Sequence, residues 1–504
     1  MGIFLIILPI IFVLTIILIV ILAIVFSKKA AKCAVSDITE NGFVNTDIQI
    51  TINTTKKFKL LTLPTNGTVS ALSGTVIVYS PNTDFIGSDN FIYETSQGCV
   101  EQNILICDVL FNQQGNKLVG TGATGTAGQG SSVAISNDGL TLVVGGRNDN
   151  GNIGAVWLYS RTSTNATFAQ QGSKLVGTGA IGSSAQGTRI ALSGNKLVLA
   201  VGGFADNSDI GAVWIYTRTT ITSNFTQQGS KLVGTGNIGI SYQGSSVALS
   251  YDGLQLAIGG SADNTFKGAT WIFTRTSFTD VFVQQGSKLI GTGGIGTPNQ
   301  GSSVSMSNDG LQLAVGGSSD NGNLGATWIF TRTVVTNSFT QQGTKLVGTG
   351  NAGINSHQGS SIDLSANGLQ LAVGATSDDT SIGATWIFTR TAVTNLFTQQ
   401  GTKLVGSNSI TPQQGSVSLT SDGLALIVGG GGDNLGVGAS WLFTRLNVNN
   451  VFTQKGSKII GSGAIGNSAQ GNVSISDTNG FVVGGPSDNS SVGAVWTFQA
   501  TCPN

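Results

Sequence analysis

The sequence predicts an all-β protein, a seven-bladed β-propeller with an N-terminal transmembrane helix and a small β-sandwich domain. Three observations support this prediction. A long apolar segment opens the chain, short alternating segments separated by turn residues follow it, and a unit of 55 to 58 residues with one tryptophan then recurs seven times. The corresponding boundaries are 1–32 for the anchor and a short linker, 33–109 for the sandwich and 110–504 for the propeller.

The composition narrows the chemistry that the chain can perform. Its 504 residues include 24 Lys and Arg against 24 Asp and Glu, and only 10% of the residues are charged. Because nucleic-acid binding needs a basic surface, we expect no nucleic-acid partner. His357 is the single histidine, so a zinc site or a Ser-His-Asp triad would depend on it alone. We therefore expect no enzyme activity, no cofactor and no metal.

The N-terminal segment has the length of a membrane span. Residues 3–26 are apolar apart from Pro9 and Thr15, and three lysines follow by residue 32. At about 1.5 Å per residue such a helix crosses the roughly 30 Å hydrocarbon core of a bilayer. The segment is longer than the apolar core of a cleaved signal peptide. We therefore expect an uncleaved, single-pass membrane anchor.

The side of the membrane on which the body lies stays open. The lysines after the anchor would place it in the cytoplasm. Four cysteines and six Asn-x-Ser/Thr sequons favour the opposite side, so we expect the main body outside the cytoplasm or on a virion surface. The candidate glycosylation sites are Asn53, Asn66, Asn165, Asn224, Asn472 and Asn489.

Residues 33–109 have the pattern of a small β-sandwich. Short alternating segments such as 48–52 and 76–79 are separated by turn signals such as Asn66-Gly67. Segment 63–69 contains Asn-Gly-Thr-Val, and segment 79–93 reads Tyr-x-Pro-Asn-x-Asp-Phe-x-Gly-x-Asp-x-Phe-x-Tyr. This pattern resembles the cadherin-like and Ig-like repeats of large bacterial adhesins. In such arrays calcium often bridges successive copies, whereas this chain has one copy.

Seven similar units occupy the remainder of the chain. Each unit holds a Gln-Gly pair, a Lys-Leu/Ile-Val/Ile-Gly segment, and a tryptophan that follows Gly-Ala and one further residue. Repeats of this length indicate a solenoid or a propeller. The tryptophans are Trp157, Trp214, Trp271, Trp328, Trp386, Trp441 and Trp496.

Each unit is expected to contain four strands. In residues 301–350 these are 303–307, 311–316, 326–332 and 341–348. Asn308-Asp309-Gly310 joins the first two as a hairpin. Trp328 and Ile329 would lie on opposite faces of the third strand, which is apolar on both sides. Such a strand suits a sheet packed between two neighbouring sheets, which predicts the blades of a propeller.

The ends of the repeat region predict how the ring closes. A Lys-Leu-Val-Gly segment at 117–120 precedes the first unit, and the chain ends after Trp496 without one. We expect the N-terminal strand to complete the last blade.

Four cysteines suggest two disulfides. Cys107 lies just before the closing strand and Cys502 just after its expected partner, so a bond between them would staple the closure. Cys33 and Cys99 would then tie the small domain, although four cysteines allow three pairings.

The repeat resembles the FG-GAP family, which forms the propeller at the head of integrin α subunits. The resemblance lies in residues 300–304, 308–310, 313–317 and 325–330. It implies a seven-bladed propeller that binds partners on one face; WD-repeat and kelch propellers compete for the same pattern. The calcium loop of the family needs several oxygen ligands. Turns such as Ser136–Gly139 offer too few, so we predict tight turns with Asp or Asn at positive φ and no calcium.

Recurring polar residues are the candidates for partner binding. Seven aspartates lie between the second and third strands: Asp149, Asp206, Asp263, Asp320, Asp378, Asp433 and Asp488. The FG-GAP resemblance implies a ligand-binding ring there; alternatively, each aspartate accepts backbone N–H groups in its own turn. Arginines at the end of the third strand would contact anionic partners or local carbonyls. The lysines of the outer strand would discourage edge-to-edge pairing, and the tryptophans would lie in the core rather than stack on sugars.

Together these inferences favour a membrane-anchored structural or adhesive display protein whose propeller binds a protein or glycan partner. A propeller lectin is one alternative, although loop aromatics are few: Phe204, Tyr242 and Phe266. A glycosidase using paired aspartates across the central channel is another. Near-identical blades argue against it, because an active site normally breaks the symmetry of a repeat.

Overall fold

The chain divides into two compact units, residues 1–110 with 501–504 and residues 111–500. The computed structural model describes residues 35–43, 48–51, 59–73, 76–82, 87–95, 98–107, 110–351, 353 and 355–501. Within these ranges no helix is long and apolar enough to cross a bilayer. The predicted anchor at 3–26 lies outside the described residues.

The N-terminal unit consists of two sheets that share one core. The first sheet has the order β1 (Val35–Phe43), β7 (Gly98–Cys107), β6 (Gly87–Thr95) and β3 (Lys59–Leu60), with β1 parallel to β7. The second has the order β2 (Ile48–Thr51), β5 (Val76–Pro81) and β4 (Gly67–Ser73). Ile50 and Ile77 of the second sheet pack with Phe91 and Ile104 of the first. The described part is therefore a two-layered β-sandwich, and its likeness to adhesin repeats stays a prediction.

One aspartate of the adhesin-like pattern has a structural role. Asp89 is buried, and its carboxylate accepts the backbone N–H groups of Thr65 and Asn66 at 2.9 and 2.8 Å. The Tyr79 hydroxyl donates to the same carboxylate at 2.9 Å. Burial and the contact with Asp89 raise the pKa of Tyr79. Asp89 thus holds the turn before β4 against the core.

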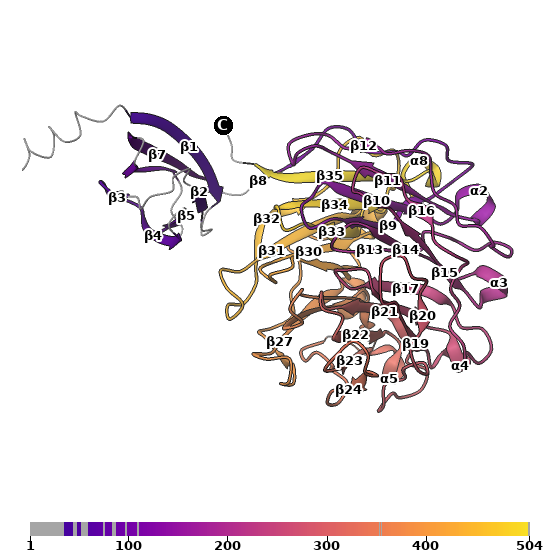
Figure 1. Cartoon of the computed structure of the whole chain (residues 1–504). Coiled ribbons are helices and arrows are strands. Elements are labelled where there is room, and N and C mark those ends of the chain that lie inside the picture. Colours follow the sequence, from indigo (N-terminus) through magenta and orange to yellow (C-terminus); the bar gives the residue numbers. More distant parts are fainter. Residues whose placement is uncertain are drawn as a thin grey trace, which may run out of the picture. The chain divides into compact units, whose positions relative to one another are not determined.

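Seven four-stranded antiparallel sheets form the propeller, with their first strands around the central axis (Figure 1). Blade 1 holds β9 (Gln129–Ile135), β10 (Thr141–Gly146), β11 (Ala155–Ser160) and β12 (Ala169–Gln170); blade 2 holds β13 (Arg189–Leu192), β14 (Val198–Gly203), β15 (Ala212–Thr217) and β16 (Thr226–Gln227). Blade 3 holds β17 (Gln243–Leu249), β18 (Gln255–Gly260), β19 (Ala269–Thr274) and β20 (Val283–Gln284); blade 4 holds β21 (Gln300–Met306), β22 (Gln312–Gly317), β23 (Ala326–Thr331) and β24 (Thr340–Gln341). Blade 5 holds β25 (Gln358–Leu364), β26 (Gln370–Ala375), β27 (Ala384–Thr389) and β28 (Thr398–Gln399); blade 6 holds β29 (Ser416–Leu419), β30 (Ala425–Gly430), β31 (Ala439–Thr444) and β32 (Thr453–Ile459). Blade 7 holds β33 (Asn472–Ile475), β34 (Gly480–Gly485), β35 (Ala494–Thr501) and β8 (Leu110–Gln113).

Short helical turns lie between the second and third strands of the blades. They are α2 (Asp149–Asn152), α3 (Asp206–Asp209), α4 (Asp263–Phe266), α5 (Asp320–Asn323), α6 (Asp378–Ser381), α7 (Asp433–Gly436) and α8 (Asp488–Ser491). We call the side of the ring that carries these turns the helix face. The opposite side, which carries the hairpins between the first and second strands, is the turn face.

Each blade buries both sides of its sheet against its neighbours, as the apolar residues on both faces of the third strand predicted. Trp328 pairs with Val315 across the sheet, and its ring lies in a cluster with Ile272 of blade 3. The next residue, Ile329, lies in the cluster with Trp386 of blade 5. Trp328 is fully buried, as are the other six tryptophans, so the prediction that they lie in the core is confirmed.

The first and last parts of the propeller chain meet in one blade. Strand β8 completes the sheet of β33, β34 and β35, and Leu118 pairs with Val495. Val495 also lies in the core cluster of blade 1. The predicted closure by the N-terminal strand is confirmed. Because one sheet contains both ends, opening the ring requires separating strands within a blade.

The proposed disulfides stay predictions. Cys99 and Cys107 lie in β7 by their backbone, but their side chains are outside the described part of the structure. Cys33 and Cys502 lie outside the described residues altogether.

Two details of the blade differ from the sequence-based expectation. The fourth strand of blade 4 was expected over 341–348, but β24 has two residues and pairing resumes only at Leu346 with Thr327. A turn around Gly343, at φ +70°, interrupts the strand. In the hairpin turn, the positive φ belongs to Gly310 rather than Asp309. The Asp309 carboxylate instead accepts the N–H of Leu311 at 2.9 Å.

A belt of backbone hydrogen bonds joins the hairpins on the turn face. Asn195 N–H donates to the carbonyl of Tyr251, and Tyr251 N–H donates to that of Asn308, each at 3.0 Å. Asn308 N–H donates to the carbonyl of Ala366 at 2.9 Å, and Ala366 N–H donates to that of Ser421 at 3.0 Å. Each of these blades is therefore tied to the next by a polar contact as well as by apolar packing.

Candidate partner-binding face

The seven predicted aspartates lie at the start of the helical turns, and all seven are buried. Each forms an ion pair with the outer lysine of its own blade. The pairs are Asp149–Lys174, Asp206–Lys231, Asp263–Lys288, Asp320–Lys345, Asp378–Lys403, Asp433–Lys458 and Asp488–Lys117. The lysines were expected only to protect the sheet edge, so this pairing is a role that the sequence did not reveal. Lys117 belongs to the closing segment, so its pair with Asp488 also helps to close the ring.

The second carboxylate oxygen fixes a connection that crosses the helix face. In blade 3, Oδ1 of Asp263 accepts the N–H of Ile238 at 2.8 Å. Equivalent bonds of 2.7–2.8 Å reach Thr124, Ile181, Ile295, Ile410 and Ile465. The aspartates therefore accept a backbone N–H group, as one of the two expected roles proposed, but the donor lies 23 or 25 residues earlier in the chain rather than in their own turn. Direct contact between their carboxylates and a partner stays a prediction, and it would require displacing a lysine.

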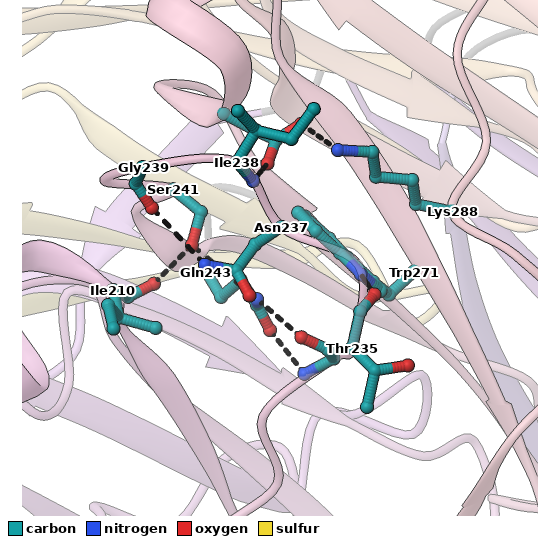
Figure 2. Close-up of polar contacts among 11 residues, drawn as sticks. Ile210, Thr235, Asn237, Ile238, Gly239, Ser241, Gln243, Trp271 and Lys288 are labelled. Atoms are coloured by element: carbon teal, nitrogen blue, oxygen red, sulfur yellow. Dashed lines mark hydrogen bonds and ion pairs between the residues drawn. The ribbon is translucent and has the colours of Figure 1, made fainter.

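Three further contacts fix the same connection, as Figure 2 shows for residues 234–243. The Gln243 side chain accepts from Gly234 N–H at 2.5 Å and donates to its carbonyl at 2.9 Å. Nε1–H of Trp271 donates to the carbonyl of Thr235 at 2.8 Å. The Ser241 hydroxyl donates to the carbonyl of Ile210 in the preceding blade at 2.8 Å. The connection is therefore held at several points by buried groups.

The result is a ring of exposed isoleucines on the helix face. The backbone N–H of each is bonded to an aspartate, but its side chain points to solvent and is 53–55% exposed. We call these residues the isoleucine ring: Ile181, Ile238, Ile295, Ile410 and Ile465. The sequence signal was a Gly-x-Ile-Gly segment that recurs before the Gln-Gly pair in four of the five blades, the exception being Asn408-Ser409-Ile410-Thr411, and its isoleucine falls outside every strand. The sequence analysis did not single out this isoleucine.

The arginines of the turn face are structural. Arg332 is buried, with its Nε–H donating to the carbonyl of Gly310 at 2.9 Å and its guanidinium 4.3 Å from the ring of Phe339. It also donates to Gln255 and Gln285 of blade 3 at 2.8 and 2.6 Å. Burial lowers the pKa of Arg332 to about 10, which leaves it charged at neutral pH. Pairing with local carbonyls, one of the two expected roles, is thus observed.

A channel of 610 Å³ follows the propeller axis and is lined by the first strands of all seven blades. Its wall is rich in serine hydroxyls. Asp363 is the one carboxylate among its lining residues, so the paired aspartates of the glycosidase alternative are not found among them. Asp363 accepts the N–H of Leu419 at 2.8 Å and the hydroxyl of Ser305 at 3.1 Å. Burial raises the pKa of Asp363 to about 6 against these bonds.

The candidate glycosylation sites occupy different environments. Asn165, Asn224 and Asn489 are exposed, whereas Asn66 is half-buried. Asn472 lines the channel, and its Nδ2 donates to the carbonyl of Gly130 at 2.9 Å, so modification there would break a bond. Asn53 lies outside the described residues. Use of any of these sequons stays a prediction.

No group of three His, Cys, Asp or Glu side chains in the described ranges is arranged to hold a metal ion. The hairpin turns occupy the position of the calcium loop in the FG-GAP pattern, and Asp309 shows how their aspartate is used. Its Oδ1 accepts from both Leu311 N–H and the Ser307 hydroxyl, the latter at 2.5 Å.

No protein-family model and no curated protein matches the sequence. Among solved structures, the chain is similar to hydrazine synthase of Kuenenia stuttgartiensis, with 12% identity, 76% of this chain and 99% of that chain covered, and a TM-score of 0.45. It is also similar to the β-propeller domain of Cps50 (Swd1) of Myceliophteria thermophila, with 11% identity, coverages of 76% and 100%, and a TM-score of 0.44. The C-terminal WD40 domain of Sif2 gives 11% identity, coverages of 79% and 99%, and a TM-score of 0.45. The propeller assignment here rests on the seven sheets and their closure.

Proposed function

We propose that this chain is a membrane-anchored structural or adhesive display protein whose propeller binds a protein partner through the isoleucine ring. The observation that carries the proposal is the combination of exposed isoleucine side chains with a backbone fixed by buried aspartate–lysine pairs. The FG-GAP likeness, which implies partner binding on one face, agrees with the proposal. Anchoring rests on the apolar segment 3–26.

Position and repetition set these isoleucines apart from ordinary exposed side chains. Single exposed apolar residues are common on protein surfaces. Here one residue type recurs at the same place in five blades, each more than half exposed. Apolar groups inside a polar surround are typical of the centre of a protein interface. Because the connection is already ordered, binding would cost little additional conformational entropy.

Site-specific photo-crosslinking tests the proposal. The full chain, produced in the organism that encodes it, would carry a photo-reactive residue at Ile238 or, as the control, at Leu396. Leu396 is 60% exposed and lies between the third and fourth strands of blade 5, on the turn face. We expect a discrete adduct with another protein from position 238 and none from 396. Equal adducts from both positions, or none from 238, would refute the proposal; an adduct of twice the chain mass would identify a second copy as the partner.

Substitutions elsewhere in the isoleucine ring provide a second test, with a matched control outside the ring. Ile181→Ser with Ile295→Ser should abolish the adduct formed from position 238, since the partner would span several blades. Val281→Ser with Val283→Ser removes two side chains of similar exposure, 58% and 65%, from blade 3: Val281 precedes the outer strand β20, and Val283 is its first residue. This second variant should leave the adduct unchanged.

Membrane anchoring and orientation need a separate measurement. The full chain should stay in the membrane pellet after alkaline carbonate extraction, and a chain lacking residues 1–32 should be released. A mass decrease on glycosidase treatment would place the body outside the cytoplasm. Release of the full chain by carbonate would remove the anchor from the proposal without affecting the crosslinking result.

A further inference from the structure

Blades 1 to 3 break the repeat symmetry where the channel opens on the helix face. Arg189 stands in the first strand of blade 2, where other blades carry serine: Ser132, Ser246, Ser303 and Ser361. Arg147 and Phe204 directly follow the second strands of blades 1 and 2, where the next three blades carry Ser261, Ser318 and Thr376. Arg189 and Thr376 line the channel. Phe204 lies two residues beyond Gly202, the sheet partner of Arg189, and the charge of Arg147 acts on Arg189, so we infer that both residues lie beside this mouth of the channel.

Two more departures lie beside them. Tyr242 precedes β17, and Phe266 ends α4. At the position of Phe266 the other blades carry small or polar residues: Asn152, Asp209, Asn323, Ser381, Gly436 and Ser491. At that of Tyr242 they carry Gly128, Ala185, Asn299, His357, Gln413 and Ala469.

The three aromatic residues form one cluster. The rings of Phe204 and Tyr242 are 5.4 Å apart, and those of Tyr242 and Phe266 are 6.3 Å apart, both edge to face. Tyr242 and Phe266 have φ of +54° and +62°, a region that bulky side chains rarely adopt. The equivalent residues of the other blades, such as Asn299 and Asn323, have the same positive φ, so what sets blade 3 apart is the size of the side chains at these positions. Phe266 is nonetheless 39% exposed, so the strain is not offset by complete burial of its ring.

The two arginines carry unneutralised charge. In the described propeller, most cations are bonded to aspartates or to the carbonyl and glutamine groups of the turn face. Arg147 is exposed on the surface, Arg189 is exposed only towards the channel that it lines, and neither forms an ion pair with a described carboxylate. The bond of the Arg189 guanidinium to the carbonyl of Thr188, at 3.0 Å, leaves most of its donors open. Desolvation inside the channel lowers the pKa of Arg189, and repulsion from Arg147 lowers it further.

The cations, the aromatic cluster and the hydroxyl-rich wall adjoin one another. Arg189 pairs with Gly202 in the sheet, two residues before Phe204. At the same level of the channel as Arg189 lie Ser132, Ser246 and Ser303, whose hydroxyls donate to backbone carbonyls and whose oxygens can still accept hydrogen bonds. A guanidinium binds a carboxylate or sulfate through two parallel bonds, and aromatic faces provide apolar surface with directional edges.

We propose that this mouth of the channel binds an acidic saccharide. Arg189 and Arg147 bind its carboxylate or sulfate, the rings of Phe204, Tyr242 and Phe266 pack against the C–H face of a sugar ring, and wall serines accept bonds from its hydroxyls. This site goes beyond the protein-binding function proposed for the isoleucine ring and does not depend on it. The few loop aromatics that argued against a lectin are thus three residues gathered at one place.

Calorimetric titration of the full chain in detergent tests the proposal. The probe is a tetrasaccharide of alternating glucuronate and N-acetylglucosamine, and the control is the same tetrasaccharide with its carboxylates reduced to alcohols. Loss of charge-assisted bonds should weaken binding of the reduced form about tenfold or more. A tetraglutamate peptide and inorganic sulfate test the other sources of negative charge. Binding of either as tight as that of the acidic saccharide, or equal binding of both saccharides, would overturn the proposal.

The repeat supplies variants that the fold already accepts. Arg189→Ser should weaken the acidic saccharide about tenfold or more and leave the reduced form unchanged. Phe266→Asn should weaken both forms. Lys455→Gln removes one positive charge from the outer strand of blade 6 and places there the residue of the six other blades, so binding should not change. Thermal unfolding confirms that each variant is folded; unchanged binding by folded Arg189→Ser, or no binding by the original chain, would also refute the site.

Discussion

Asp378→Asn tests whether the buried ion pairs stabilise the propeller. The Asp378 side chain is fully buried, and that of its partner Lys403 is 18% exposed. The substitution keeps the size of the side chain but leaves the ammonium group unpaired. Removing one partner of a buried pair costs about 3–5 kcal/mol. Because Lys403 can regain some hydration, we expect a decrease of about 2–3 kcal/mol in the free energy of unfolding.

The adjacent residue provides the control. Asp379 is exposed, and six other blades carry asparagine at its position, so Asp379→Asn should change stability by less than about 0.5 kcal/mol. Thermal unfolding of the full chain at pH 7, followed by calorimetry, measures both variants. For the 390 residues from Phe111 to Ala500, an unfolding entropy of about 2.1 cal/mol/K per residue converts the first loss to about 2–4 °C. Equal shifts for the two variants, or disappearance of the difference in 1 M salt, would refute a buried pair.

Two other substitutions test the channel and the crossing connection. Asp363→Ser gives blade 5 the serine that blades 4, 6 and 7 carry at this position. Because the pKa of Asp363 in the folded chain is raised to about 6, the original chain should lose stability as the pH rises from about 4 to 7. The variant should lack about 1–3 kcal/mol of that loss in denaturant titrations, and identical pH profiles would contradict the assignment. In Gly234→Ala the added Cβ would lie 2.2 Å from Cδ1 of Trp271, which should destabilise the chain by about 2–3 kcal/mol. Gly431→Ala, whose Cβ meets nothing closer than 3.4 Å, is the matched control, and an equal loss there would show that the tryptophan is not the cause.

The sequence predicted the parts of the fold that depend on local pattern. Regular spacing of Trp157 and its equivalents, apolar residues on both faces of each third strand, and the extra segment at 117–120 were sufficient to predict blades and closure. These features reflect strand periodicity and the need to bury two sheet faces. They can be read from the order of residues in the sequence without knowing any contact.

The candidate site depended on contacts that pattern does not reveal. Lys288 and Asp263 are 25 residues apart, and they meet because the outer strand passes beside the helical turn of its own blade. The exposure of Ile238 likewise follows from the path of its connection, since isoleucine in a strand would be buried. Phe204, Tyr242 and Phe266 are separated along the chain but gather because adjacent blades converge at the channel.

Replacing the isoleucine ring tests most directly whether its side chains serve partner binding while the buried aspartate–lysine pairs serve stability. A chain with all five isoleucines changed to serine should unfold within about 1 kcal/mol of the original, because the side chains are more than half exposed and their N–H groups stay bonded. A photo-reactive residue at position 266, on the same face, should form the partner adduct in the original chain. It should form no adduct in the chain with five serines. Retention of the adduct, or a loss of stability as large as that of Asp378→Asn, would contradict the assignment of the ring to partner binding.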